Sequence, residues 1–213
     1  MIIKNIVFTG ILMLTTLSVE AKTIFALNNQ YFSETMPKEK SKKSKDGNMI
    51  GARYDVGDVI VSTNLSRWNS GVLGTLPERS DGYFSIDLKQ PIQNWVVSAN
   101  VSYYFFNGCH QATSYSIRLG ADNGESIYIT TNSCDVVIND NKFTLSKHTL
   151  RDVPLNYFIK TKGDTIIVKL NGQTLVTLPK GEFDTLATIE LTMASPLRFR
   201  KSSHIKNLVI SQK

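Results

Sequence analysis

The stretch Ile159-Lys-Thr-Lys-Gly-Asp-Thr-Ile-Ile-Val-Lys-Leu-Asn-Gly-Gln-Thr-Leu-Val-Thr-Leu178 decides the fold. Asn171-Gly172 is the residue pair that a type I′ turn favours, because both central positions need positive φ, which Asn and Gly tolerate. Lys162-Gly163-Asp164 makes the preceding turn. Between the turns the side chains alternate between two faces, and one face is made by Ile166, Val168 and Leu170. The stretch therefore predicts three consecutive antiparallel strands.

Short runs of the same kind continue from Ile50 to the C-terminus, separated by Gly, Asn, Asp and Pro, and none has a sustained helical period. Their number and spacing predict an all-β fold, a jelly-roll sandwich of two antiparallel sheets in one domain over residues 50–213. We expect the last strand to pair near the N-terminal strand and close the sandwich. The expected strands are Asp58–Ser62, Gly82–Leu88, Trp95–Phe106, Ser114–Leu119, Ser126–Thr131, Cys134–Ile138, Lys142–Ser146, Asn156–Thr161, Thr165–Leu170, Gln173–Leu178, Thr188–Met193 and Ile205–Ser211.

Residues 1–21 are typical of a secretory signal peptide, with Lys4 before an apolar stretch and Val19-Glu20-Ala21 at a cleavage site after Ala21. The apolar stretch Ile6–Leu17 has 12 residues, whereas a spanning helix needs about 20. No cysteine lies near the cut, which excludes a lipoprotein. We therefore expect an exported protein, periplasmic, cell-surface or secreted, without a transmembrane segment in the mature chain.

Residues 22–49 are predicted to be a flexible, lysine-rich lead-in to the sandwich. Within it, Pro37–Asp46 holds five lysines against Glu39 and Asp46, a local charge of +3 in a chain of net charge +6. Lysines can attract phosphate or anionic lipid headgroups. The run contains no arginine and no aromatic residue on which a base could stack, so we do not expect a nucleic-acid partner.

Cys109 and Cys134 are the only cysteines, and an even count in an exported chain predicts a disulfide between them. The sequence between them predicts a hairpin whose turn is Gly120–Glu125. If Ala121 faces Gly124 in this turn, the two cysteines lie almost opposite each other at the open end of the hairpin.

Aromatic residues suggest a sugar-binding surface, because pyranose rings stack their C–H faces on aromatic rings. In Tyr103-Tyr-Phe-Phe106, Tyr103 and Tyr104 point to opposite sides of a strand, so one of the two sides must face the core. The other could line an open sheet face with Tyr115 and Tyr128. The alternative is that both sides are covered. The candidate ligand-binding residues are thus Tyr103, Tyr104, Tyr115 and Tyr128.

Four features together resemble the concanavalin A-like lectin and glucanase superfamily, especially its laminin-G-like jelly rolls. They are an early strand Gly82–Leu88, an aromatic strand Val96–Phe106, the hairpin Gly163–Gly172 and the closing strand Ile205–Ile210. The resemblance covers about residues 55–213 and implies the sandwich fold. It leaves function open, because the superfamily includes sugar binders, protein binders and glycosidases.

Glucanases of that superfamily often carry Glu-x-Asp-x-x-Glu on one strand, which supplies the two carboxyl groups that glycoside hydrolysis needs. The nearest match here is Glu182-Phe-Asp184, where Ala187 replaces the last Glu and Gly181 indicates a turn. Asp87 is a lone strand carboxylate. We therefore do not expect an enzyme, although two carboxylates from different strands could still converge.

The resemblance also implies that calcium can bind in loops. Asp122, Asn123 and Glu125 offer hard oxygen ligands in one tight turn. The same residue types also form turns without a metal. Calcium is thus a possible cofactor on these three residues, and no other cofactor is expected.

The favoured functional hypothesis is a lectin-like, non-catalytic module that binds carbohydrate or a cell-envelope polymer. The alternative is a protein-interaction or structural subunit of a bacterial surface or secretion assembly. The first predicts an exposed aromatic side chain among polar groups on a sheet or loop rim. The second predicts an exposed apolar patch without convergent polar groups.

Overall fold

The computed structural model describes residues 21–27, 52–63, 68–69, 72–73, 82–102, 114–131, 134–145, 155–194 and 204–213. These residues form strands and turns. Within the described ranges there is no helix, and hence none long and apolar enough to cross a membrane. The predicted all-β class is confirmed.

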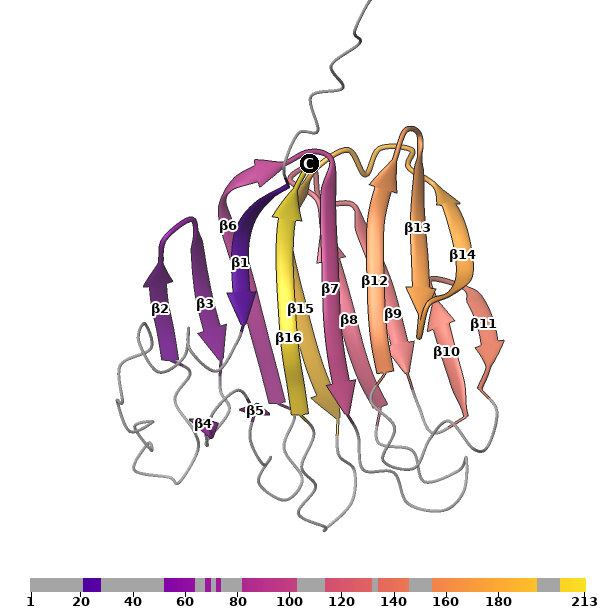
Figure 1. Ribbon diagram of the computed structural model, residues 1–213, viewed down its shortest axis with the longest axis horizontal. Coiled ribbons are helices and arrows are strands. Elements are labelled where there is room, and N and C mark those ends of the chain that lie inside the picture. The colour runs from indigo at the N-terminus through magenta and orange to yellow at the C-terminus, as the bar shows by residue number, and fades with distance from the viewer. Residues whose placement is uncertain are drawn as a thin grey trace, which may run out of the picture.

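Six strands form one antiparallel sheet, which lies in front in Figure 1. Its order is β1-β16-β7-β12-β13-β14. The C-terminal strand β16 pairs with β1 on one side and with β7 on the other. Its N-terminal partner is therefore Lys22–Leu27, which the sequence did not predict as a strand, and not the first expected strand Asp58–Ser62, which lies in the other sheet. The bounds are β1 Lys22–Leu27, β7 Trp95–Ser102, β12 Leu155–Lys162, β13 Thr165–Leu170, β14 Gln173–Pro179 and β16 His204–Gln212.

Eight strands form the second antiparallel sheet, behind the first in Figure 1, in the order β11-β10-β9-β8-β15-β6-β3-β2. The sandwich prediction is therefore confirmed. Two further strands of two residues, β4 Trp68–Asn69 and β5 Val72–Leu73, pair with each other and are hydrogen-bonded to neither sheet. The bounds of the eight are β2 Ala52–Val56, β3 Val59–Thr63, β6 Gly82–Ile92, β8 Ser114–Gly120, β9 Ser126–Thr131, β10 Asp135–Ile138, β11 Asn141–Thr144 and β15 Leu186–Ala194.

The core lies between the two sheets, because alternate side chains of each strand point inward. Trp95 is fully buried, and its ring lies edge to face against Phe183 with 5.7 Å between the ring centroids. Tyr157 of the six-stranded sheet and Thr131 of the eight-stranded sheet share a buried hydrogen bond between their hydroxyl groups. Full burial of a large apolar side chain contributes about 1.5–3 kcal/mol, so this layer supplies most of the stability.

The meander predicted from Ile159–Leu178 is present as β12, β13 and β14. Asn171 and Gly172 both have positive φ, 49° and 83°, as a type I′ turn requires. The burial of β13 alternates along the whole strand, with Ile166, Val168 and Leu170 facing the core.

The expectation of a flexible lead-in over residues 22–49 is wrong for its first six residues. Lys22–Leu27 is β1, and its Phe25 and Leu27 are 2% and 1% exposed in the core. The sheet therefore begins at Lys22, well before residue 50. Residues 28–49, which include the lysine run, and the predicted signal peptide up to residue 20 lie outside the described residues.

Candidate functional site

A row of polar side chains crosses the outer face of the eight-stranded sheet. Glu190 on β15 pairs with Ser85 on β6 and with Arg118 on β8, and Arg118 pairs in turn with Tyr128 on β9. Their neighbours along each strand, such as Ile117 and Ile189, are buried in the core. The alternation that builds the core therefore sends these four side chains outward together.

Arg118 is the centre of this row. Its Nη1 donates a hydrogen bond to Glu190 Oε2 at 3.0 Å, and its Nε donates to Ser126 Oγ at 3.1 Å. Its guanidinium carbon lies 5.6 Å from the centroid of the Tyr128 ring, a cation–π distance. The hydrogen bond to Glu190 raises the pKa of Arg118 above its ordinary value. These contacts hold a charged pair and an aromatic ring in one arrangement.

Tyr128 is the only large hydrophobic residue that is exposed among those the structure describes, at 49%. Its backbone N–H and carbonyl are both hydrogen-bonded to Asn139 in the β10–β11 turn. The Tyr128 N–H donates to Asn139 Oδ1 at 2.9 Å, and the Asn139 N–H donates to the Tyr128 carbonyl at 2.8 Å. The ring is thus presented from a rigid strand and not from a loop.

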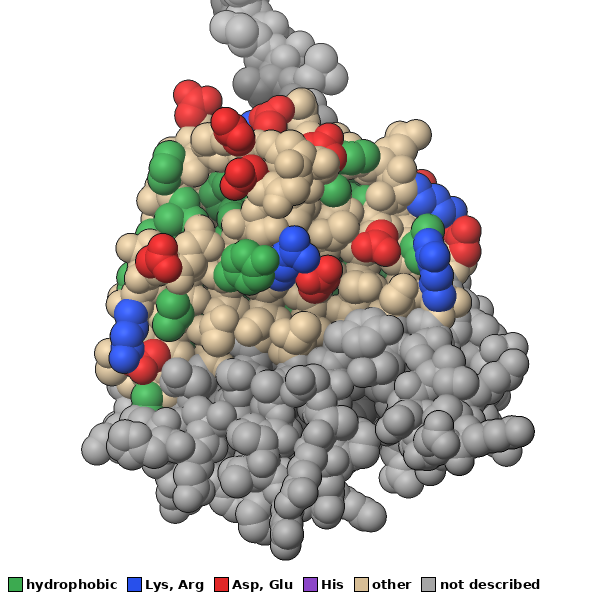
Figure 2. Space-filling model, turned by 180° about the vertical axis from the view of Figure 1, so that it is seen from behind, with side chains coloured by type: hydrophobic (Ala, Val, Ile, Leu, Met, Phe, Trp, Pro, Cys, Tyr) green, Lys and Arg blue, Asp and Glu red, His purple; other side chains and the backbone are tan. Residues whose placement is uncertain are grey.

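Hydroxyl groups surround the pair of charged residues. Ser116 and Thr130, each two residues along the strand from Arg118 and Tyr128, share a hydrogen bond of 3.1 Å between their hydroxyls. Figure 2 shows this face, with a hydrophobic, a basic and an acidic side chain gathered near the centre of a surface that is otherwise mostly backbone and uncharged polar side chains. The face offers an aromatic ring, guanidinium N–H donors, carboxylate acceptors and hydroxyls. This combination can bind a polyhydroxylated ligand.

The four predicted aromatic residues have different outcomes. Tyr128 is exposed on the outer face, as a ligand-binding role requires. Tyr115 lies on β8, paired with Thr131, but its side chain is outside the described part of the structure. Tyr103 and Tyr104 lie outside the described residues altogether. The ligand-binding role of all four stays a prediction.

Arg118 and Glu190 were not predicted as site residues, because the sequence did not reveal which residues face each other on neighbouring strands. The β8–β9 hairpin is present, but Ala121 faces Glu125, with an N–H···O distance of 2.8 Å, and does not face Gly124. In the observed register Arg118 lies opposite Tyr128. A register based on core-to-core pairing of the two strands would have revealed this contact.

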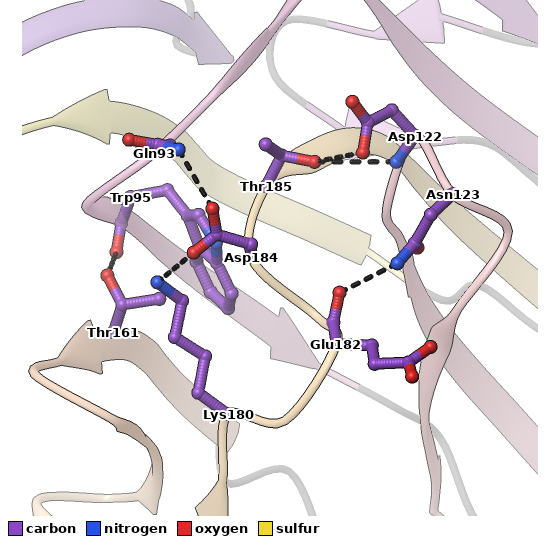
Figure 3. Close-up of polar contacts among 9 residues, drawn as sticks. All are labelled: Gln93, Trp95, Asp122, Asn123, Thr161, Lys180, Glu182, Asp184 and Thr185. Carbon is purple, nitrogen blue, oxygen red and sulfur yellow. Dashed lines mark hydrogen bonds and ion pairs between the residues drawn. The ribbon is translucent and has the colours of Figure 1, made fainter.

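In the turn that was proposed to bind calcium, Asp122 and Asn123 are hydrogen-bonded to other residues of the protein (Figure 3). Asp122 Oδ1 accepts a hydrogen bond from Thr185 Oγ1 at 2.6 Å, and Asn123 Nδ2 donates to the Glu182 carbonyl at 2.8 Å. Asn123 Oδ1 accepts from the Glu125 N–H at 3.1 Å. The described residues contain no group of three or more His, Cys, Asp or Glu placed to hold a metal. The contacts explain the turn without calcium, and calcium binding stays an untested prediction.

Glu182 and Asp184 lie in the connection from β14 to β15, as the turn prediction stated. Asp184 Oδ2 accepts from Gln93 Nε2 at 2.8 Å, and its other oxygen forms an ion pair with Lys180 (Figure 3). Between the two acids, Phe183 is buried against Trp95. These contacts therefore anchor the connection between β14 of the six-stranded sheet and β15 of the eight-stranded sheet.

The predicted disulfide stays a prediction, because Cys109 lies outside the described residues. Cys134 is half-buried just before β10, and its carbonyl accepts the Leu145 N–H at 2.7 Å. No free cysteine occurs in the part of the chain that the structure describes.

The sequence matches no protein-family profile and no curated protein sequence. Solved structures do share the fold. SCLam, a non-specific endo-beta-1,3(4)-glucanase from family GH16, has 13% identity and a TM-score of 0.60 over 92% of each chain. The exoplasmic/lumenal domain of VIP36 in its Ca2+/Man-bound form has 8% identity and a TM-score of 0.56, over 75% of this chain and 84% of that one.

The CBM2 module of the evolved Dit of Lactobacillus casei BL23 phage J-1 is also similar, with 13% identity and a TM-score of 0.56 over 90% of this chain and 95% of that one. The fold is a concanavalin A-like jelly roll. The resemblance noted from the sequence is therefore confirmed for the fold. At these identities the likeness extends to the fold alone, and the solved structures that share it include a glucanase and a Ca2+/Man-bound domain.

Proposed function

We propose that the protein is an exported, non-catalytic module that binds carbohydrate through the outer face of its eight-stranded sheet. One observation carries the proposal: the exposed Tyr128 ring is held by Arg118, which is itself hydrogen-bonded to Glu190. An aromatic ring beside a paired donor and acceptor has the chemistry of a sugar site. The ring stacks on the C–H face of a pyranose, and the charged pair binds its hydroxyls.

The pairing of Arg118 with Glu190 favours an uncharged sugar. An anionic group approaching Arg118 would meet the Glu190 carboxylate 3.0 Å from the guanidinium. A hydroxyl can accept from the guanidinium and donate to the carboxylate at the same time. The ligand class is therefore a neutral glycan or envelope polysaccharide.

The protein-interaction alternative predicted an exposed apolar patch without convergent polar groups. Among the described residues the only exposed large hydrophobic side chain is Tyr128, and charged groups converge on it. This arrangement favours the carbohydrate reading. Two solved structures with a similar fold also support the proposal, because one is a Ca2+/Man-bound domain and the other is named a CBM2 module.

A screen of the purified protein against neutral oligosaccharides and polysaccharides, with calcium and with chelator, tests the proposal. Changing Tyr128 to Ala should weaken saturable binding by roughly thirtyfold, as loss of a central aromatic contact does. Tyr128→Phe keeps the ring and should retain most of the affinity. Loss of binding in chelator would show that calcium takes part.

The control variant is Thr174→Ala, an exposed residue on β14 of the other sheet, which should bind like the wild type. If no neutral glycan binds, or if Tyr128→Ala binds as tightly as wild type, the proposal is wrong.

One observation favours a second candidate, a glycoside hydrolase. Asp87 pairs with Thr188 across β6 and β15, so it lies diagonal to Glu190 on the same outer face. Diagonal neighbours in a sheet are about 7–8 Å apart, within the range that two catalytic carboxylates need. Glu190 is already engaged by Arg118 in an ion pair of 3.0 Å, which a catalytic role would have to accommodate. Release of reducing ends from a bound glycan, abolished by Asp87→Asn, would establish this activity.

A further inference from the structure

Charge is divided unequally between the two sheets. The strands of the six-stranded sheet contain no Asp or Glu, and their five lysines are Lys22, Lys160, Lys162, Lys169 and Lys206. The strands of the eight-stranded sheet are balanced, with Arg53, Lys89, Arg118 and Lys142 against Asp55, Asp87, Asp135 and Glu190. One side of the sandwich is therefore positive and the other is neutral.

The lysines of β12 and β13 also have no ion-pair partner among the residues that the structure describes. These lysines are Lys160, Lys162 and Lys169. Three of the four basic residues in the strands of the other sheet do have partners, Lys89 with Asp55, Arg118 with Glu190 and Lys142 with Asp135. The positive charge of the six-stranded sheet is thus left available to a partner.

These lysines point to the outer face and surround one aromatic ring. Lys169 pairs with Phe158 across β12 and β13, and Lys160 is two residues along β12 from Phe158. The Lys160 ammonium lies 5.7 Å from the centroid of the Phe158 ring. Residues between them, such as Ile159 and Val168, are buried, so the three side chains share the solvent side. We call Phe158, Lys160, Lys162 and Lys169 the lysine face.

The rest of this surface carries polar side chains beside a few apolar ones that are largely buried. Ser98 pairs with Phe158, and beyond it Asn100 Nδ2 donates to Asn156 Oδ1 at 2.8 Å. The apolar side chains here do not protrude, since Phe158 and Ile167 are only half-exposed or less. A bilayer-binding surface needs apolar side chains that insert, and a protein interface has an apolar centre. Neither feature occurs among the described residues of this surface.

We infer that the lysine face binds an acidic polysaccharide, a hydroxyl-rich chain that carries carboxylate, sulfate or phosphate groups. Unpaired ammonium groups attract the anionic groups, and the neighbouring amides and hydroxyls hydrogen-bond to the sugar units. The Phe158 ring offers a part-exposed apolar surface between the charges. This site is separate from the Tyr128 row and does not depend on it, because the two lie on opposite sides of the sandwich.

Dextran sulfate and dextran are matched probes, since they differ in charge on the same backbone. We expect the protein to bind dextran sulfate saturably, and to lose that binding as salt rises from about 0.05 M to about 0.5 M, because screening shortens the reach of exposed charges. The double variant Lys160→Gln/Lys169→Gln should bind roughly tenfold more weakly. The double variant Lys89→Gln/Lys142→Gln removes the same formal charge from the other sheet and should bind within about twofold of wild type.

Three results would overturn the inference. Equal weakening by the two double variants would mean that net charge alone attracts the polymer. Tighter binding to poly-glutamate, or to vesicles of phosphatidylglycerol and phosphatidylcholine, would identify a protein or a membrane as the partner. Absence of binding to dextran sulfate at low salt would remove the site. Tyr128→Ala should leave dextran sulfate binding unchanged, which separates this test from that of the neutral-glycan site.

Discussion

The two outer faces of the sandwich are built on the same core but differ in chemistry. On the eight-stranded sheet, Arg118 is paired with Glu190 and lies beside an exposed Tyr128. On the six-stranded sheet, Lys160 and Lys169 have no acidic neighbour in any strand of the sheet. Packing between the sheets fixes only the inward side chains, so stability does not dictate this difference. The difference is therefore the basis for proposing two ligands, a neutral glycan for one face and an acidic polysaccharide for the other.

The largest expected effect is on the stability of the fold, from a substitution in β1, the edge strand of the six-stranded sheet. Leu27 on β1 is 1% exposed. Leu27→Ala should lower the free energy of unfolding by about 2–5 kcal/mol, through lost burial and the cavity left behind. Urea unfolding measures the shift in midpoint. Thr23→Ala, an exposed residue of the same strand, should change stability by less than about 0.5 kcal/mol.

If Leu27→Ala behaves like Thr23→Ala, residues 22–27 are a lead-in and not a strand. The six-stranded sheet would then end at β16. A full effect of Leu27→Ala together with unchanged dextran sulfate binding in the folded variant would show that the two faces draw on a common core but act separately.

The strands that the sequence predicted best are those whose alternating β-branched or apolar residues lie between clear turn residues. Thr165–Leu170 and Ser126–Thr131 have the bounds expected, because their β-branched alternation and flanking turn residues act together. Lys22–Leu27 was missed since it contributes only Phe25 and Leu27 to the core, between polar neighbours. Its strand character comes from pairing with β16, far away in the sequence, which local pattern does not reveal.

The candidate site was predicted only in part for a related reason. Tyr128 could be found as an aromatic residue on a predicted strand, but Arg118 and Glu190 become site residues only through register. The turn-based register would have put Arg118 opposite Ile127, a core residue. A one-residue shift moves every side chain to the other face, so matching core residues across the hairpin fixes the register better than the turn does. Glu190 joins from β15, a pairing that no local signal encodes.

A smaller effect on stability is expected at Gly120, where β8 lies close to β15. A Cβ added at Gly120 would overlap Thr188 Oγ1 on the neighbouring strand. Gly120→Ala should therefore lower the free energy of unfolding by about 1–3 kcal/mol, because the β-branched Thr188 has little room to rotate. Thermal or urea unfolding measures the loss.

Thr188→Ala removes the overlapping hydroxyl, so the double variant should recover most of the stability that Gly120→Ala loses. Dextran sulfate binding should be the same in all three variants, since the strain lies on the opposite sheet. Additive losses in the double variant would mean that the two residues do not touch in this way.

The smallest expected effect comes from Glu190→Gln, which tests directly whether the ion pair with Glu190 keeps Arg118 from attracting an acidic polymer. Glu190→Gln keeps the shape of the side chain but removes the charge that balances Arg118. Both side chains are more than a third exposed, so the change in stability should stay below about 1 kcal/mol. In the Lys160→Gln/Lys169→Gln background, where binding through the lysine face is weakened, Glu190→Gln should restore dextran sulfate binding by about two- to fivefold at low salt. Adding Arg118→Gln should cancel that gain, because it removes the charge that Glu190→Gln exposes. A gain that survives Arg118→Gln would mean that the acidic polymer binds elsewhere, and that pairing of Arg118 with Glu190 does not keep the eight-stranded face neutral.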